Sequence, residues 1–256
     1  MTMPMLENRH ALVTGGGSGL GAAIAVALAD AGARVTIVGR RREPLEEVAS
    51  TRGSIRALLA DVTNEVSLVA AFADAISAGG RLSIVVANAG AAESAPFART
   101  SLNAFERMIA VNLTGVFLTL REGTRAMADA KWGRLIVIAS IAGLRGYSYV
   151  APYSAAKHGA IGLVRSLAME LAETGITVNA VCPGYAATPM LEQSIARIIR
   201  KTGRGEAEAR KMLTEVNPGG RLVEPVEVAE AVLNLCSPAS DRVTGQAVQI
   251  PEGALA

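Results

Sequence analysis

Short apolar runs alternate along this chain with longer stretches in which apolar residues recur at helical spacing. The runs are typical of buried parallel strands, which we expect at 11–13, 34–38, 55–59, 83–87, 135–139, 177–181 and 247–250. Helices are expected between them, at 22–31, 44–50, 65–78, 102–128, 152–174 and 225–235. Such alternation indicates right-handed crossovers and a parallel sheet covered by helices on both faces. We therefore predict a doubly wound α/β fold.

The composition limits the class of protein. Half of the 256 residues are hydrophobic, and the chain has no internal repeat or Pro/Ser-rich linker, which predicts a single domain over residues 1–256. A formal net charge of +2 with mixed signs argues against nucleic-acid binding. The chain lacks a stretch apolar enough to span a bilayer, so we expect no membrane partner and a cytoplasmic location. Cys182 and Cys236 predict reduced core thiols rather than a disulfide or a metal site.

A glycine-rich loop follows the first predicted strand and precedes the first predicted helix. It reads Thr14-Gly15-Gly16-Gly17-Ser18-Gly19-Leu20-Gly21. Glycines permit a tight turn and let the backbone approach a pyrophosphate, while the helix offers unpaired N–H groups and its positive dipole end. A tight strand-to-helix connection without a ligand is the alternative. The strand–loop–helix context favours a bound dinucleotide.

Other polar residues stand where predicted parallel strands end. Asp61, Asn88-Ala89-Gly90, Ser140 and Pro183-Gly184 each follow an apolar run. Carboxyl ends of parallel strands meet at one edge of the sheet, where open α/β sheets bind ligands. We expect these residues along one rim, although loops are polar in any case.

The segment from Ser140 to Lys157 combines a hydroxyl, a phenol and an amine. Pro152 suits a helix's first turn, so Tyr153 and Lys157 fall at positions i and i+4 on one helix face. A neighbouring cation stabilises phenolate, so Lys157 is predicted to lower the pKa of Tyr153 and make it an acid–base group. An ordinary surface pair is the alternative.

Taken together, these motifs resemble the short-chain dehydrogenase/reductase family over nearly the whole chain. The glycine loop is similar to the family's cofactor motif, and Asn88-Ala89-Gly90 to its structural turn. Pro183-Gly184 followed by Thr188 is similar to the segment that holds the nicotinamide carboxamide. The family's catalytic tetrad is matched, at its spacing, by Asn112, Ser140, Tyr153 and Lys157.

The resemblance implies a Rossmann-like sheet of about seven strands, with a dinucleotide-binding half at about 1–130 and a catalytic and lid half at about 131–256. It implies hydride transfer between a nicotinamide and a small-molecule alcohol or carbonyl compound. Tyr153 would be the acid or base, Lys157 would also bind the nicotinamide ribose, and Ser140 would bind the substrate oxygen. Asn112 would mark a helix distortion holding a proton-relay water, unless it only caps its own helix.

The cofactor preference rests on the end of the second predicted strand. Gly39 stands where NAD enzymes carry an acid that binds the ribose, and Arg40, Arg41 and Arg42 follow it. This favours NADP, although Ser18 stands where NADP-dependent members often carry a second basic residue, so NAD stays open. The residues expected to bind the cofactor are Thr14, Gly15, Ser18, Gly19, Leu20, Gly21, Arg40, Arg41, Asp61, Val62, Asn88, Ala89, Gly90, Tyr153, Lys157, Pro183, Gly184 and Thr188. Asp61 would contact the adenine.

The substrate is the least determined part of the prediction. Tyr147, Tyr185 and Met190 should flank the pocket and favour an uncharged, partly apolar carbonyl compound. The predicted lid after Thr188 carries an apolar stripe and six basic residues, Arg197, Arg200, Lys201, Arg204, Arg210 and Lys211. These cations indicate either a site for the phosphates of an acyl thioester, on coenzyme A or a carrier protein, or a solvated helix face.

Two classes of function stay open at this point. The first is an active oxidoreductase, possible substrates including a 3-oxoacyl thioester; the second is a catalytically silent dinucleotide-binding regulator or scaffold. The complete tetrad favours the enzyme, and the glycine spacing disfavours a sugar-nucleotide epimerase. The resemblance also implies a homotetramer paired through the helices at 102–128 and 152–174.

Overall fold

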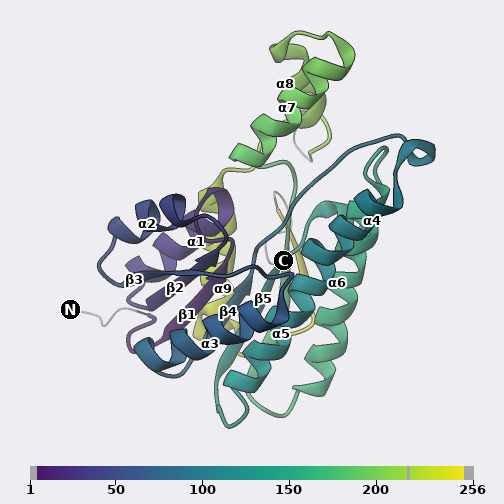
Figure 1. Cartoon of the computed structure of the whole chain (residues 1–256). Coiled ribbons are helices and arrows are strands. Elements are labelled where there is room, and N and C mark those ends of the chain that lie inside the picture. Colours follow the sequence, from purple (N-terminus) through teal and green to yellow (C-terminus); the bar gives the residue numbers. More distant parts are fainter. Residues whose placement is uncertain (1–4, 218–219, 251–256) are drawn as a thin grey trace.

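The sheet is the centre of the fold (Figure 1). The computed structural model describes residues 5–217 and 220–250, so the ends of the predicted domain at 1–4 and 251–256 lie outside it. Within this part of the chain, seven strands form one parallel sheet in the order β3-β2-β1-β4-β5-β6-β7. The strands are β1 (His10–Thr14), β2 (Arg34–Gly39), β3 (Ile55–Leu59), β4 (Ile84–Ala87), β5 (Gly133–Ile138), β6 (Ile176–Pro183) and β7 (Ala247–Ile250). The predicted doubly wound, single-domain α/β fold is confirmed.

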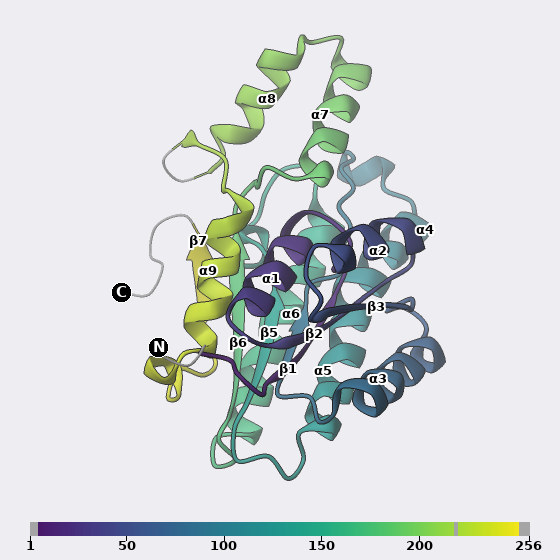
Figure 2. The same cartoon turned by 90° about the vertical axis from the view of Figure 1, so that its left-hand side faces the viewer.

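Helices cover both faces of this sheet (Figure 1 and Figure 2). One face carries α1 (Gly19–Asp30), α2 (Arg42–Ser50) and α9 (Pro225–Cys236), and the other carries α3 (Glu65–Gly79), α5 (Gly115–Ala126) and α6 (Ala151–Glu170). Successive strand residues alternate between the two cores: Val13 packs in the first and Leu12 in the second. Burial on both faces explains why the strands are continuous apolar runs.

The helix predicted at 102–128 is interrupted. It consists of α4 (Leu102–Ile109), a π-helical segment at Ala110–Thr114, and α5. The other boundaries shift by a few residues: α1 begins at Gly19 rather than 22, because the end of the glycine loop is already helical, and α6 ends at Glu170 rather than 174. These differences leave the predicted order of elements unchanged.

A lid of two helices projects beyond the carboxyl ends of the strands (Figure 2). The helices are α7 (Pro189–Thr202) and α8 (Glu206–Thr214), which occupy the lid region expected after Thr188, although neither is among the helices that the sequence predicts. They form a small apolar cluster of their own, in which Leu191 and Ile195 of α7 pack with Leu213 of α8. The described part of the chain contains no helix of the length and apolarity needed to cross a membrane.

Candidate active site

The glycine loop lies between β1 and α1, and its glycines are required by its shape. Gly15 and Gly19 have φ angles of 68° and 54°, in the left-handed region that side chains disfavour. A Cβ atom on Gly21 would stand 2.3 Å from the Gly15 carbonyl oxygen, so α1 packs directly on the loop. Ser18, the N-cap residue, makes no side-chain bond to the helix, which leaves first-turn N–H groups for a ligand. This cradle fits the pyrophosphate of a dinucleotide.

The turn after β4 is bonded to this loop. Thr14 Oγ1 accepts the N–H groups of Asn88 and Ala89, each at 3.1 Å. The Asn88 amide donates to the carbonyl oxygens of Thr14 at 2.9 Å and Gly15 at 3.3 Å. β1 and β4 are the neighbours at which the strand order reverses, and ligands of doubly wound sheets bind at such a point. The predicted structural turn therefore holds one wall of the predicted cofactor site.

The segment after β6 closes the opposite side of this site. A Cβ atom on Gly19 would lie 3.3 Å from the Thr188 side chain, so the predicted carboxamide-binding segment and the glycine loop lie against each other. Gly184 faces Asn217, whose oxygen a Cβ atom would approach to 2.3 Å.

Asp61 and Arg40 lie together where β3 and β2 end, on the side of the glycine loop away from β4. Arg40 approaches the Asp61 carboxylate to 3.9 Å, and the Arg40 side chain is 72% exposed. Burial would raise the pKa of Asp61, but hydrogen bonds from the Thr63 N–H and hydroxyl, together with Arg40, lower it. Two neighbouring residues were also predicted to bind the cofactor. Arg41 is the N-cap residue of α2, and Val62 is buried against Gly115.

Asn112 occupies the middle of the π-helical segment and is fully buried. Its Nδ2 donates to the carbonyl oxygens of Ala91 at 2.9 Å and Met108 at 3.1 Å, and its Oδ1 accepts the Ala91 N–H at 3.2 Å. The Gly115 N–H bonds to Ala110, five residues back, which is the hydrogen bond of a π-helix. The helix distortion predicted at this position is therefore present, and the bonds of Asn112 to Ala91 tie it to the segment after β4.

The other three tetrad residues meet at the end of β5. Ser140 lies two residues after the end of that strand, and its hydroxyl interacts with the Tyr153 phenol. Lys157 Nζ donates to the Ile138 carbonyl oxygen at 2.8 Å and lies 5.7 Å from the Tyr153 ring centroid. A Cβ atom on Gly90 would lie 3.0 Å from Asn112 Oδ1 and 3.8 Å from Lys157 Nζ, so Gly90 connects the two halves of the tetrad.

Burial determines the pKa values at this point. Burial raises the pKa of Tyr153 to about 12, although the hydrogen bond with Ser140 lowers it, and the Tyr185 phenol adds to the rise. The sequence prediction of a lowered pKa for Tyr153 is therefore wrong in this structure, because loss of solvation outweighs the favourable contacts. Burial also lowers the pKa of Lys157 to about 8. At neutral pH the phenol carries its proton and the amine is mainly protonated.

The predicted substrate residues lie in different settings. Tyr185 is half-buried and close enough to Tyr153 to affect its pKa. Tyr147 is also half-buried, and Arg145 donates to its hydroxyl at 2.6 Å. Met190, in the first turn of α7, is 40% exposed. Both cysteines are free and buried, as predicted, and burial raises the pKa of Cys182 to about 11.

Asn217 is a site residue that sequence reasoning missed. It is 4% exposed, accepts the Tyr185 N–H at 2.7 Å, and donates to the carbonyl oxygens of Tyr185 at 2.8 Å and Arg221 at 2.7 Å. It therefore joins the end of the lid to the loop that begins at Gly184. A single asparagine in a glycine- and proline-rich stretch indicates a turn, but not the loop that it holds.

A parallel sheet with a glycine cradle at its switch point, beside a Ser–Tyr–Lys group whose lysine is buried, defines a dinucleotide-dependent oxidoreductase. The pattern of the short chain dehydrogenase family matches residues 9–198. The chain is 36% identical to the 3-oxoacyl-(acyl-carrier-protein) reductase of Aquifex aeolicus, covering 97% of this chain and 98% of that protein. It is 40% identical to the cis-4-hydroxycyclohexanecarboxylate dehydrogenase of Sinomonas cyclohexanicum, covering 96% of each.

The solved structures agree with these sequence matches. The crystal structure of an actinorhodin polyketide ketoreductase variant with NADPH superposes with a TM-score of 0.91, at 36% identity, covering 96% of this chain and 97% of that one. The chain belongs to the short-chain dehydrogenase/reductase family, whose enzymes act on CH–OH and C=O groups with a nicotinamide dinucleotide.

Proposed function

We propose that the chain is an NADP-preferring reductase that converts the ketone of a 3-oxoacyl compound to a secondary alcohol, with Tyr153 as the acid. The observation that carries the proposal is the meeting of Ser140, Tyr153 and Lys157 beside the glycine cradle. The nicotinamide, when bound, supplies the hydride.

The residues of this chain would manage the charge and the proton. Reduction of a carbonyl places negative charge on its oxygen, which the hydroxyls of Ser140 and Tyr153 would stabilise as hydrogen-bond donors. Tyr153 would then transfer its proton to that oxygen. Lys157 would stabilise the resulting phenolate and bind the ribose, and Asn112 would hold the water that returns a proton.

The pKa of Tyr153 supports the reductive direction. A phenol with a pKa of about 12 is protonated at neutral pH, as an acid must be, whereas oxidation of an alcohol requires phenolate.

The cofactor preference is proposed from the end of β2. Gly39 presents no carboxylate, and Arg40 and Arg41 follow it with exposed side chains. A 2′-phosphate would replace the weak pairing of Arg40 with Asp61 by charge-assisted hydrogen bonds. The NADPH-bound relative is consistent with this preference.

The substrate class is proposed from the relatives. One is named as a reductase of 3-oxoacyl groups on acyl carrier protein, and another as a dehydrogenase of a hydroxycarboxylate. The first name describes a ketone on an acyl group held by a carrier protein, and the second a secondary alcohol on a molecule that also carries a carboxylate. The half-buried Tyr185 and Tyr147 would line the neutral reacting end of such a substrate.

The proposed tetramer rests on exposed apolar side chains of three helices. Leu102 and Phe105 of α4, Phe117 of α5 and Met169 of α6 are large apolar side chains exposed to solvent. Small residues on α6 would let a second copy approach closely. Light scattering at micromolar concentration tests this, and a monomer would contradict it.

The test of the proposed reaction is oxidation of NADPH with acetoacetyl thioesters and simple ketones. Tyr153→Phe should remove turnover while preserving dinucleotide binding and thermal stability, since it deletes only the hydroxyl. Ser50→Ala, which deletes an exposed hydroxyl on α2, is the matched control and should behave as wild type. Undiminished turnover in Tyr153→Phe would refute the mechanism, and absence of turnover with every carbonyl compound would favour the silent dinucleotide-binding protein.

A further inference from the structure

The basic residues of the lid fall into two groups. The first group pairs with glutamates, through the pairs Arg204–Glu208, Arg210–Glu192, Arg210–Glu206 and Lys211–Glu215. The second group is Arg197, Arg200 and Lys201 on α7, and among residues 5–217 and 220–250 no carboxylate lies within ion-pair distance of these three. Arg200 and Lys201 of the second group are exposed and Arg197 is half-buried, so what distinguishes this group is the absence of glutamate partners.

The three unpaired cations line one cavity. It has a volume of about 260 Å³ and lies between α7, α4 and the segment after β4. Its lining residues are Glu93, Ser94, Ala95, Thr100, Ala104, Met108, Tyr149, Pro152, Arg197, Arg200 and Lys201. Pro152 precedes Tyr153 in α6, and Met108 accepts a hydrogen bond from Asn112. The cavity therefore adjoins the proposed catalytic residues.

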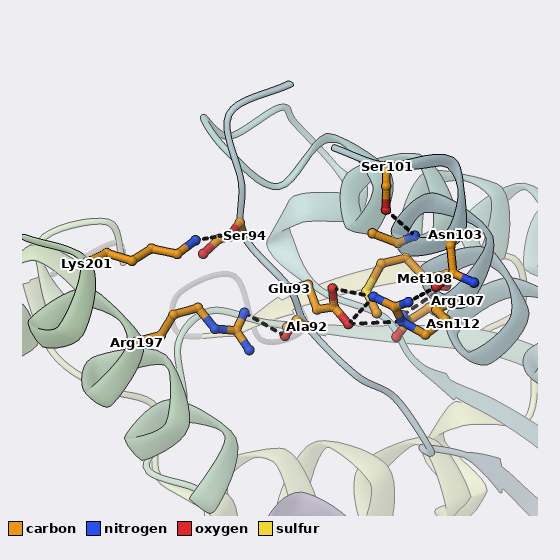
Figure 3. A network of polar contacts seen from close by, with 11 residues as sticks. Ala92, Glu93, Ser94, Ser101, Asn103, Arg107, Met108, Asn112, Arg197 and Lys201 are labelled. Carbon is orange, nitrogen blue, oxygen red and sulfur yellow. Dashed lines mark hydrogen bonds and ion pairs between the residues drawn. The ribbon is translucent and has the colours of Figure 1, made fainter. Parts of the chain in front are cut away.

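The walls of this cavity are bonded to one another. Arg197 donates to the Ala92 carbonyl oxygen at 3.4 Å and Lys201 to that of Ser94 at 3.0 Å (Figure 3). Tyr149, with a φ of 70°, accepts the Ala95 N–H at 2.9 Å. A non-glycine residue in this left-handed conformation is strained, and the surrounding structure must hold it in place.

The charge in the cavity is not balanced by the protein. Glu93 is the acidic residue of the lining, and it is bound through both carboxylate oxygens to Arg107. Arg197 and Lys201 donate to neutral carbonyl groups, which leave their charge uncompensated and most of their N–H groups unused. Arg200 has no hydrogen-bond or ion-pair partner in the described part of the chain.

We infer that this cavity binds an anionic group, a carboxylate or a phosphate, that the substrate carries in addition to the carbonyl that is reduced. The inference rests on the proposed function and adds an anionic requirement to it, because the cavity adjoins Tyr153 and presents three uncompensated cations. Arg200 and Lys201 also lie in the last turn of α7, where cations favour the helix dipole. A dipole role alone would not affect one class of substrate more than another.

The experiment compares substrates that share a reacting group and differ in charge. kcat/KM is measured for acetoacetyl-coenzyme A, for acetoacetate, and for the neutral N-acetylcysteamine thioester of acetoacetate. Arg200→Gln and the Arg200→Gln/Lys201→Gln double variant remove cavity charge. Arg204→Gln and Lys211→Gln remove one charge each from the glutamate-paired group of the same lid and serve as matched controls.

In the cavity variants we expect kcat/KM to fall roughly tenfold per removed charge for the anionic substrates and to stay within about twofold for the neutral thioester. The controls should leave all three values unchanged. The anion is a phosphate if only acetoacetyl-coenzyme A responds, and a carboxylate if acetoacetate responds. Equal losses for charged and neutral substrates, or a wild type without preference for an anion, would overturn the inference while leaving the reductase intact.

Calorimetry tests the anion site by measuring binding alone, so it does not depend on turnover. Coenzyme A and acetoacetate are titrated into wild type and each variant, with the dinucleotide site saturated by NADP⁺ so that the probes cannot occupy it. Weaker binding of either probe to Arg200→Gln, but not to Arg204→Gln, supports the anion site even if no carbonyl compound is reduced. Failure of both probes to bind, or equal binding to all variants, refutes it.

Discussion

Lys157→Met tests whether the buried ammonium is kept at the expense of stability. Lys157 is 3% exposed, and burial lowers its pKa from 10.5 to about 8. Each tenfold change in proton affinity corresponds to about 1.4 kcal/mol, so burying the protonated amine costs the folded state about 3 kcal/mol at pH 7. The substitution also removes the hydrogen bond to the Ile138 carbonyl oxygen, which destabilises the variant by about 1 kcal/mol. We expect a net stabilisation of about 2 kcal/mol, a rise in Tm of roughly 4–8 °C.

The pH dependence identifies the cause of that gain. The folded pKa of Lys157 lies below its unfolded value, so between about 8 and 10.5 the unfolded chain binds a proton that the folded protein has released. Wild-type stability should therefore rise with pH in this window. At pH 9.5 the advantage of the variant from this source should be roughly half of its value at pH 7.

The assay is urea unfolding of the dinucleotide-free protein at pH 7 and pH 9.5, paired with NADPH oxidation. Lys157→Met should lose turnover and bind dinucleotide more weakly while being the more stable protein. The control is Lys131→Met, which replaces an exposed lysine outside the active site and should change the free energy of unfolding by no more than about 0.5 kcal/mol. A variant less stable than wild type at pH 7, or a stability difference independent of pH, would show that the reasoning on burial is wrong.

Three further predictions concern other parts of the molecule. Gly39→Asp with Arg40→Ala should reverse the preference for NADPH over NADH, measured as the ratio of kcat/KM, because the new carboxylate would repel a 2′-phosphate. A Cβ atom at Gly39 meets only ordinary contacts, so the substitution should not strain the fold. A wild type that already prefers NADH tenfold would contradict this prediction. Asn217→Ala should raise KM for the dinucleotide more than it changes kcat, since the buried Tyr185 N–H loses its partner. Burial lowers the pKa of His10, despite its bond to Gly80, so the free energy of unfolding should fall as pH drops below about 6.5, and His10→Gln should remove that dependence in urea titrations.

The sequence by itself determined the family and the order along the chain of the strands and of the helices that cover the sheet. Apolar runs that alternate with helical periodicity reflect burial on both faces of a parallel sheet, which is a local property of each segment. The glycine loop is equally local, because the φ angles of Gly15 and Gly19 and the close packing at Gly21 exclude side chains whatever the rest of the chain does. The i, i+4 spacing of Tyr153 and Lys157 likewise follows from the helix alone.

Only the tertiary structure decided the electrostatics of the site and the role of the lid. A pKa depends on how much water the folded protein excludes, so the raised value for Tyr153 opposes the effect expected from its neighbour in sequence. Asn217 gains its importance from Tyr185, 32 residues away. The six lid cations separate because Arg204, Arg210 and Lys211 each pair with a glutamate four residues away in the chain, whereas the three cations of α7 have no such glutamate and line a cavity. The spacing of the glutamates can be read from the sequence, but the cavity forms only where α7 meets α4 and the segment after β4, and no local pattern records those contacts.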